Sequence, residues 1–159
     1  MSAAVSSVLL TLDALDPLPV DTVCLFVSED ERPLGGAAGF VDWRLCGQLS
    51  RLLADGFFQG ARGESLLLPS SGRIGPQRLV VLGMGPGGEA LHGGVLRMAL
   101  SQAADVLNRA RVDSVALELP GRGAMPAQER TSAFAEAFVP AFRGARVTIL
   151  SEAPPRPSR

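Results

Sequence analysis

Apolar residues recur along the chain in two kinds of pattern, separated by turn-forming residues. Short apolar runs within residues 6–16, 21–31, 63–72, 77–85, 112–121 and 145–152 are bounded by Gly, Pro, Ser or Asp, which is typical of strands. Longer segments at 37–56, 89–111 and 126–144 carry apolar residues three and four positions apart, which predicts helices. Strand-like and helix-like segments therefore alternate along the chain.

The apolar positions of these helices fall on single faces. In the first helix the face consists of Val41, Leu45, Leu49, Leu52 and Leu53. In the second it consists of Leu96, Ala99, Leu100, Ala103, Val106, Leu107 and Ala110. The third segment contains Pro140, which can break a helix.

Several strand-like runs are apolar at consecutive positions, which favours strands buried on both faces. Together with one-faced helices, they predict an α/β fold, namely a three-layer αβα sandwich around a mixed central sheet of about five to six strands. We expect one domain over residues 1–151 and a flexible tail at 152–159.

Composition narrows the function classes. The 159 residues are 47% hydrophobic and 19% charged, with a net charge of −1, so bulk attraction to nucleic acid or an anionic membrane is not expected. All basic residues other than the histidine are arginines, and tyrosine is absent, which excludes chemistry that needs a lysine or a tyrosine of this chain. The N-terminus does not resemble a signal peptide, no apolar run is long enough for a membrane span, and Cys24 and Cys46 are expected to be reduced, so we expect a cytoplasmic location.

A glycine cluster follows the apolar run at 78–82 and precedes a helix. Its residues Gly83, Gly85, Gly87 and Gly88 satisfy G-x-G-x-x-G, which is the pattern of a nucleotide phosphate loop. Pro86 inside the loop has no N–H to offer, and the next acidic strand residue, Glu118, comes about 30 positions later rather than about 20. The favoured interpretation is a structural turn with positive φ values, and no cofactor is expected.

Other chemistry-bearing residues do not form a recognisable catalytic or metal-binding set. His92 is the only histidine, and it stands just inside a helix start. Serines in the turn at 70–71 lack a nucleophile-elbow motif. The acidic residues are explained as solvated faces: Glu29, Asp30, Glu31, Asp42 and Asp55.

One set of aromatic residues has two interpretations. Phe134, Phe138 and Phe142 recur every four residues, so they share a helix face. Such a stripe is usually core, but part of it could form an interface with a partner protein or a second copy, together with Trp43 on the first helix.

The order of these segments resembles the N-terminal domain of the leucyl aminopeptidase (cytosol aminopeptidase) family. The segment "VDWRLCGQLSRLL" resembles that family's D-x-x-L-x-G-x-L-S helix, through Asp42, Leu45, Gly47, Leu49 and Ser50. The segment "FFQGARGESLLL" resembles its F-x-G-x-x-G-E run, through Phe58, Gly60, Gly63 and Glu64. "RLVVLGMG", "LRMALSQAADVLNRARVDSVALELP" and "AFAEAFVPAF" add weaker similarity, and the whole resemblance spans about residues 20–143.

The resemblance implies a fold akin to macro domains, which bind ADP-ribose, and a glycine turn that is only structural. It also implies that the family's two-metal peptidase site lies in a separate C-terminal domain, with ligands that include a lysine and with motifs such as N-T-D-A-E-G-R. This sequence contains neither. We therefore expect no aminopeptidase activity, no catalytic residues and no metal site.

Four functions remain open in a definite order. The first is a non-catalytic protein-interaction or regulatory module that contacts a partner protein or itself. The alternative is a macro-like binder of ADP-ribose or a related nucleotide, although the G-G-G-V loop of macro domains is absent and Asn108 is the only asparagine. An enzyme of unknown type and a DNA-binding protein rank lower.

Overall fold

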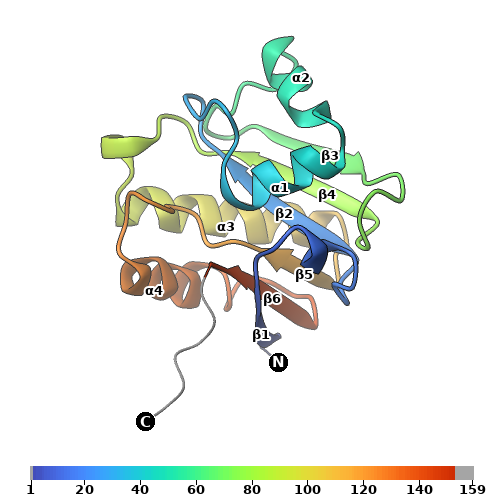
Figure 1. Cartoon of the computed structure of the whole chain (residues 1–159). Coiled ribbons are helices and arrows are strands. Elements are labelled where there is room, and N and C mark those ends of the chain that lie inside the picture. The colour runs from blue at the N-terminus through green and yellow to red at the C-terminus, as the bar shows by residue number, and fades with distance from the viewer. Residues whose placement is uncertain (1, 153–159) are drawn as a thin grey trace.

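A computed structural model describes residues 2–152 and contains one mixed sheet of six strands (Figure 1). The strands are β1 (Ala4–Leu9), β2 (Thr22–Val27), β3 (Ser65–Pro69), β4 (Arg78–Gly83), β5 (Ser114–Leu117) and β6 (Arg146–Ser151). Their order in the sheet is β1-β6-β5-β2-β4-β3, and β3 pairs antiparallel with β4 while the other pairs are parallel. The predicted mixed sheet is confirmed.

Four α-helices cover the two faces of the sheet. Helices α1 (Gly36–Arg44) and α2 (Gln48–Ala54) lie on one face, and α3 (Gly93–Arg109) and α4 (Ala127–Ala137) lie on the other (Figure 1). Single 3₁₀ turns at Asp13–Leu15 and Gly88–Ala90 complete the fold. The predicted αβα sandwich is therefore confirmed, while most of the expected tail, residues 153–159, lies outside the described residues.

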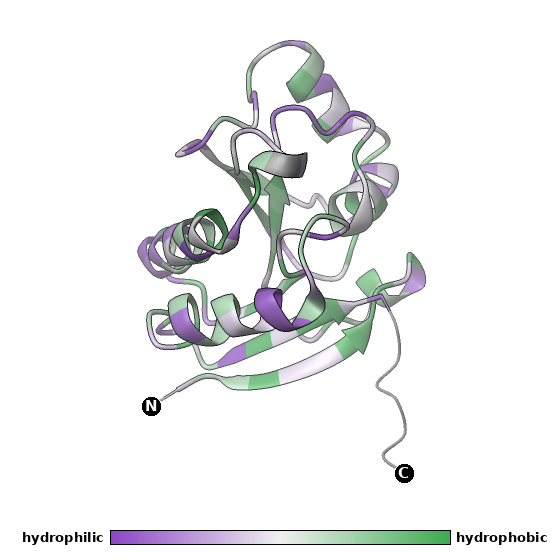
Figure 2. Ribbon diagram, turned by 90° about the vertical axis from the view of Figure 1, so that its left-hand side faces the viewer, coloured by the Kyte–Doolittle hydropathy of each residue, from purple (hydrophilic) through white to green (hydrophobic). Residues whose placement is uncertain are grey.

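Strand β2 shows why the sheet needs a helical layer on each side. Val23, Leu25 and Val27 pack into the apolar cluster under α1 and α2, whereas Cys24 packs into the cluster under α3 and α4. Figure 2 shows the hydrophobic colour concentrated in the strands between helices that carry hydrophilic stretches. A central parallel strand with both faces buried gives a continuous apolar run in the sequence.

The expected first helix is in fact two helices, because the backbone turns after Arg44. Cys46 and Gly47 have φ values of 56° and 82°, which no α-helix contains. The carboxylate of Asp42, which is buried, accepts the N–H groups of Leu49 and Ser50 at 2.8 and 3.2 Å and so caps the start of α2. Asp42 is therefore a structural residue rather than part of a solvated face.

The first strand is shorter than the sequence predicts. It ends at Leu9, and residues 13–15 form a 3₁₀ turn in which the N–H of Ala14 donates to Thr11 Oγ1 at 3.1 Å. This turn buries Leu15 completely in the cluster under α1 and α2. In the sequence, apolar residues of a turn that pack into the core look the same as strand residues.

Within the described residues, no helix combines the length and apolarity needed to cross a bilayer.

Candidate functional site

A cleft of about 380 Å³ lies at the carboxyl ends of β5, β2 and β4, which are neighbours in the sheet. Its walls are the loops that follow these three strands. The chain leaves β4 through α3 and returns as β5 on the opposite side of β2, so the connections diverge at this edge. In open α/β sheets such a divergence leaves a crevice where ligands commonly bind.

The loop after β2 places two carboxylates in the wall of this cleft. Asp30 Oδ1 accepts a hydrogen bond from the N–H of Gly87 at 3.0 Å, and Glu31 Oε1 accepts one from the N–H of Gly35 at 3.2 Å. Glu29 and Asp30 do form an exposed turn, as expected, but Asp30 and Glu31 also each hold a loop of the cleft.

The glycine cluster forms the second wall, and four of its N–H groups are already used. Those of Gly83, Met84 and Gly85 donate to carbonyl oxygens of neighbouring segments at 2.8 to 2.9 Å, and that of Gly87 donates to Asp30. Pro86 has no N–H. A phosphate loop needs several such groups pointing at the ligand, so this loop does not have the geometry of a phosphate cradle.

Backbone conformation explains why glycine occupies two of these positions. Gly85 has a φ of 76°, which is the left-handed region that the structural interpretation expects. A Cβ at Gly83 would collide with the carbonyl oxygen of Ala61, so the backbones of the two segments approach too closely for a side chain.

The loop after β5 contributes Glu118, whose side chain is only 14% exposed. Its Oε1 accepts a hydrogen bond from the N–H of Ala37, in the first turn of α1, at 3.2 Å. Among the described residues, its Oε2 is a buried oxygen without a hydrogen-bond partner. Burial raises the pKa of this carboxyl above its ordinary value, although the N–H of Ala37 and the charges of Arg122 and Arg130 act in the opposite direction.

Two arginines surround this carboxylate in different ways. Arg130 on α4 donates to the carbonyl oxygens of Leu119 and Pro120 at 2.5 and 3.1 Å, so it fixes the loop after β5. The Nε of Arg122 lies 3.9 Å from Glu118 Oε2, which is too long for a hydrogen bond, and it also pairs with Glu152. Burial lowers the pKa of Arg130, against the charge of Glu118.

The remaining candidates for chemistry do not assemble here. Cys24 lies at the base of the cleft, but burial raises the pKa of its thiol far above the ordinary value, so it stays protonated and is a poor nucleophile. Cys46 is exposed and lies beside Arg73 near the start of α2, away from the carboxyl edge. His92 precedes α3 and does not line the cleft. In the described part of the chain, no three His, Cys, Asp or Glu side chains are grouped so that they could hold a metal ion.

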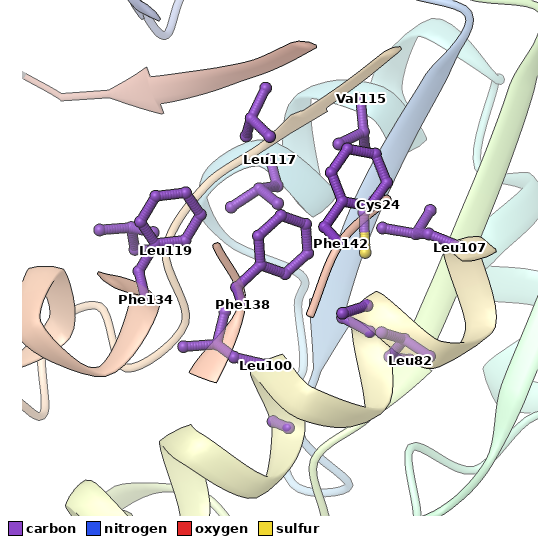
Figure 3. Packing of buried hydrophobic residues seen from close by; sticks show 14 of the residues in the cluster. Cys24, Leu82, Leu100, Leu107, Val115, Leu117, Leu119, Phe134, Phe138 and Phe142 are labelled. Atoms are coloured by element: carbon purple, nitrogen blue, oxygen red, sulfur yellow. The ribbon is translucent and has the colours of Figure 1, made fainter. Parts of the chain in front are cut away.

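The candidate aromatic interface needs a correction. Phe134, Phe138 and Phe142 are 4%, 0% and 3% exposed, and their rings stack in sequence with centroids 5.2 Å apart. Figure 3 shows them packed among Cys24, Leu100, Leu107 and other residues of the cluster under α3 and α4. These rings therefore form core, and only Trp43, which is 75% exposed, remains available at the surface.

The motifs behind the family resemblance have structural roles. Glu64 accepts hydrogen bonds from the N–H groups of Gln59 and Ala61, the latter at 2.8 Å, and Gly60 accepts the N–H of Gly85. They hold the segment before β3 against the glycine loop. In the sequence, Glu118 stands out only as the acidic residue that follows the glycine cluster at a distance, because its pairing with α1 joins residues 81 positions apart.

These features define the class of protein as a three-layer α/β domain with a macrodomain-like fold. The chain belongs to the cytosol aminopeptidase family, as its N-terminal domain, with residues 22–141 matching the family model. It is 25% identical over 105 residues to a probable cytosol aminopeptidase of Alkaliphilus metalliredigens, covering 66% of this chain and 21% of that protein.

Solved structures confirm the fold. A mutant of tomato leucine aminopeptidase superposes with a TM-score of 0.65 at 16% identity, covering 96% of this chain and 33% of that one. The macrodomain of Oceanobacillus iheyensis, solved with ADP, gives 0.68 at 12% identity, covering 94% of this chain and 86% of that one. The chain thus spans about a fifth of its curated relative and a third of the tomato enzyme.

Proposed function

We propose that this domain is a non-catalytic protein-interaction or regulatory module of the cytosol, which acts by binding through the cleft at the carboxyl edge of the sheet. The observation that carries the proposal is the way the polar groups of the cleft are used. Asp30, Glu31 and Glu118 each accept a hydrogen bond from a backbone N–H of a surrounding loop. Such groups shape a binding site, whereas a serine or cysteine nucleophile needs an activating base within hydrogen-bond reach.

Peptide hydrolysis is the first activity to test. Purified chain is incubated with leucyl p-nitroanilide and either Zn²⁺ or Mn²⁺, and we expect no turnover because the chain contains no lysine and no metal-ligand motif of the family. Turnover that persists after rigorous removal of contaminating peptidases would contradict the proposal.

Binding of ADP-ribose or a related nucleotide is the second candidate, and the fold favours it. The O. iheyensis macrodomain with a similar fold was solved with ADP. The local chemistry weighs against a diphosphate. Three N–H groups of the cleft are taken by Asp30, Glu31 and Glu118, and the charges of these carboxylates would also repel a diphosphate.

Calorimetric titration with ADP-ribose, NAD and ATP separates the two candidates. We expect no binding tighter than millimolar for any of them. Micromolar binding that is lost in the Gly85→Val variant, compared with a Gly72→Val control in an open turn with a similar φ of 74°, would establish the nucleotide function instead.

The partner in this proposal is a protein, either a different one or a second copy of the chain. Trp43 is the only tryptophan and is largely exposed on α1, so its emission reports any contact that covers this helix. We expect self-association to shift the emission to shorter wavelength as concentration rises, with a matching change in light scattering. Constant emission and a monomeric mass at all concentrations would contradict the homo-oligomer.

A further inference from the structure

Glu118 is placed unusually for a structural carboxylate. Within residues 2–152 its Oε2 is the one buried side-chain oxygen or nitrogen without a hydrogen-bond partner. A buried acceptor without a donor is costly, and a buried charge more so, which is why native proteins rarely retain one. Its position in the wall of a cleft suggests that the missing donor comes from outside the chain.

The surroundings hold this carboxylate in one place. Its Oε1 is bound to the N–H of Ala37, and a Cβ at Gly36 would collide with the same oxygen, so α1 begins directly against the carboxylate. Arg130 is already bound to two carbonyl oxygens of the loop after β5. The N–H of Ala37 and the guanidinium of Arg130 could therefore donate to Oε2 only by breaking the hydrogen bonds that they already make.

Arg122 comes close to Glu118 Oε2, but it does not form a hydrogen bond with it. Its Nε stays 3.9 Å away and also pairs with Glu152, and its side chain is 46% exposed. A solvent-exposed arginine on a loop can move at little cost, so a cationic group from a ligand can take its place beside Glu118.

The charged side chains of the cleft favour a ligand of positive charge. The charged side chains that line it are three carboxylates, Asp30, Glu31 and Glu118, against one guanidinium, Arg122. A low-dielectric cleft lined by one sign of charge concentrates ions of the opposite sign. Three N–H groups of the cleft, those of Gly87, Gly35 and Ala37, are bound to these carboxylates and are not available to an anion.

We propose that the cleft binds a guanidinium or ammonium group, which donates to Glu118 Oε2 and replaces Arg122 as its counterion. This inference rests on the proposed binding function and names the chemistry of its anchor. The group can belong to a free small amine or to a basic side chain of a peptide, and the planar guanidinium, with its several fixed donors, suits a carboxylate better than an ammonium does.

Protonation of Glu118 should oppose this binding. A cation needs the ionised carboxylate, so affinity should fall as pH falls through the raised pKa of Glu118. The charged groups that face this carboxylate are Arg122 from its own loop, Arg130 from α4 and Glu31 from the loop after β2. Glu118 is the group that contacts the bound cation, so we assign the pH response to it.

Calorimetric titration of the purified chain tests the proposal with matched probes. Acetyl-arginine amide represents a side chain, agmatine a free amine, and acetyl-citrulline amide is the neutral isostere of the first. We expect the arginine probe to bind about ten-fold or more tightly than the citrulline probe. Tighter binding of agmatine than of the arginine probe would assign the site to a free amine, and the reverse would assign it to a peptide side chain; both support the proposal.

Three variants locate the contact. Glu118→Gln keeps the acceptor for Ala37 but loses the charge, and we expect it to weaken arginine binding about ten-fold or more. Glu136→Gln, on the exposed surface of α4, should leave binding unchanged, and Arg122→Ala should strengthen it by removing the internal competitor. Thermal melts check that each variant is folded.

Equal affinity for arginine and citrulline probes, or no loss in a folded Glu118→Gln variant, would overturn the inference. So would the absence of measurable binding of every cationic probe at millimolar concentration. These outcomes leave the proposed non-catalytic function untouched, because that function fails on different results, namely peptide turnover or micromolar nucleotide binding.

Discussion

Two carboxylates stand at opposite ends of the same three strands, and their surroundings differ sharply. Asp21 precedes β2 and joins the starts of β2, β4 and β5, whereas Glu118 follows β5 and faces the cleft. Both oxygens of Asp21 accept hydrogen bonds, from donors on Thr22, Arg78, Asp113 and Ser114. Glu118 is bound through one oxygen only.

The pKa values of these two carboxyls are shifted in opposite directions. Burial is the largest single influence on the pKa of Asp21 and pushes it upward, but the combined hydrogen bonds and the charge of Arg78 hold that pKa below its ordinary value. For Glu118 burial is also the largest influence, and its few partners do not offset it, so its pKa is raised. Hydrogen-bond donors surround the structural carboxylate Asp21 on both oxygens, whereas Glu118, which we propose binds a ligand, has a donor on one oxygen only.

Removing a core side chain should have the largest effect on stability, and this effect serves as the reference for changes at the two carboxylates. Phe138 is fully buried between the rings of Phe134 and Phe142, so Phe138→Ala should lower the free energy of unfolding by about 3–5 kcal/mol, as measured by urea titration. Phe57→Ala, at a ring that is 69% exposed, is the control and should change it by less than about 0.5 kcal/mol. A small effect at Phe138 would restore these rings as a surface feature.

The next effect concerns the fit of α1 against Glu118. Gly36→Ala combines a positive φ of 54° with a collision between the new Cβ and the carboxylate, and we expect a loss of about 2–3 kcal/mol. Gly56→Ala, with a φ of 75° and open space, should cost only about 1 kcal/mol. Adding Glu118→Ala to Gly36→Ala should recover part of the difference in chemical denaturation; purely additive losses would show that the carboxylate does not press on α1.

At the saturated end, Asp21→Ala should destabilise the fold by about 2 kcal/mol, because the N–H groups of Asp113 and Ser114 lose a charged acceptor. The lowered pKa means that this contribution is present above about pH 3.8 and is lost as pH falls through the folded-state pKa. Unfolding curves of both proteins at several pH values test this, and a difference that grew on acidification would contradict the role given to Asp21.

The smallest effect should have the opposite sign. Glu118→Gln removes a charge whose burial disfavours the folded state, so it should raise the free energy of unfolding by less than about 1 kcal/mol at neutral pH. Because the folded-state pKa is raised, this gain should shrink as pH falls through that pKa and vanish below about pH 4.5. Clear destabilisation by this variant at neutral pH, measured by thermal melts, would mean that Glu118 is as structural as Asp21.

Much of the fold could be predicted from the sequence. Runs such as 79–82 in β4 and 115–117 in β5 are buried on both faces, and a strand with two buried faces must be apolar at consecutive positions. The stripe of α3 was visible because one helix face packs on the sheet, and Leu96, Leu100 and Leu107 are fully buried. The glycine turn was expected to contain positive φ values, and Gly85 and Gly88 have them.

The sequence by itself determined the layers, because hydrophobic periodicity depends only on near neighbours in the chain. Only the tertiary structure decided which polar residues meet: Glu118 with Ala37, Asp30 with Gly87, and Asp21 with Ser114. These pairs are 57 to 93 positions apart, and nothing local marks one carboxylate as saturated and another as short of a donor. The burial of Phe138 was likewise settled by packing, since a four-residue spacing is the same for a core stripe and for an interface.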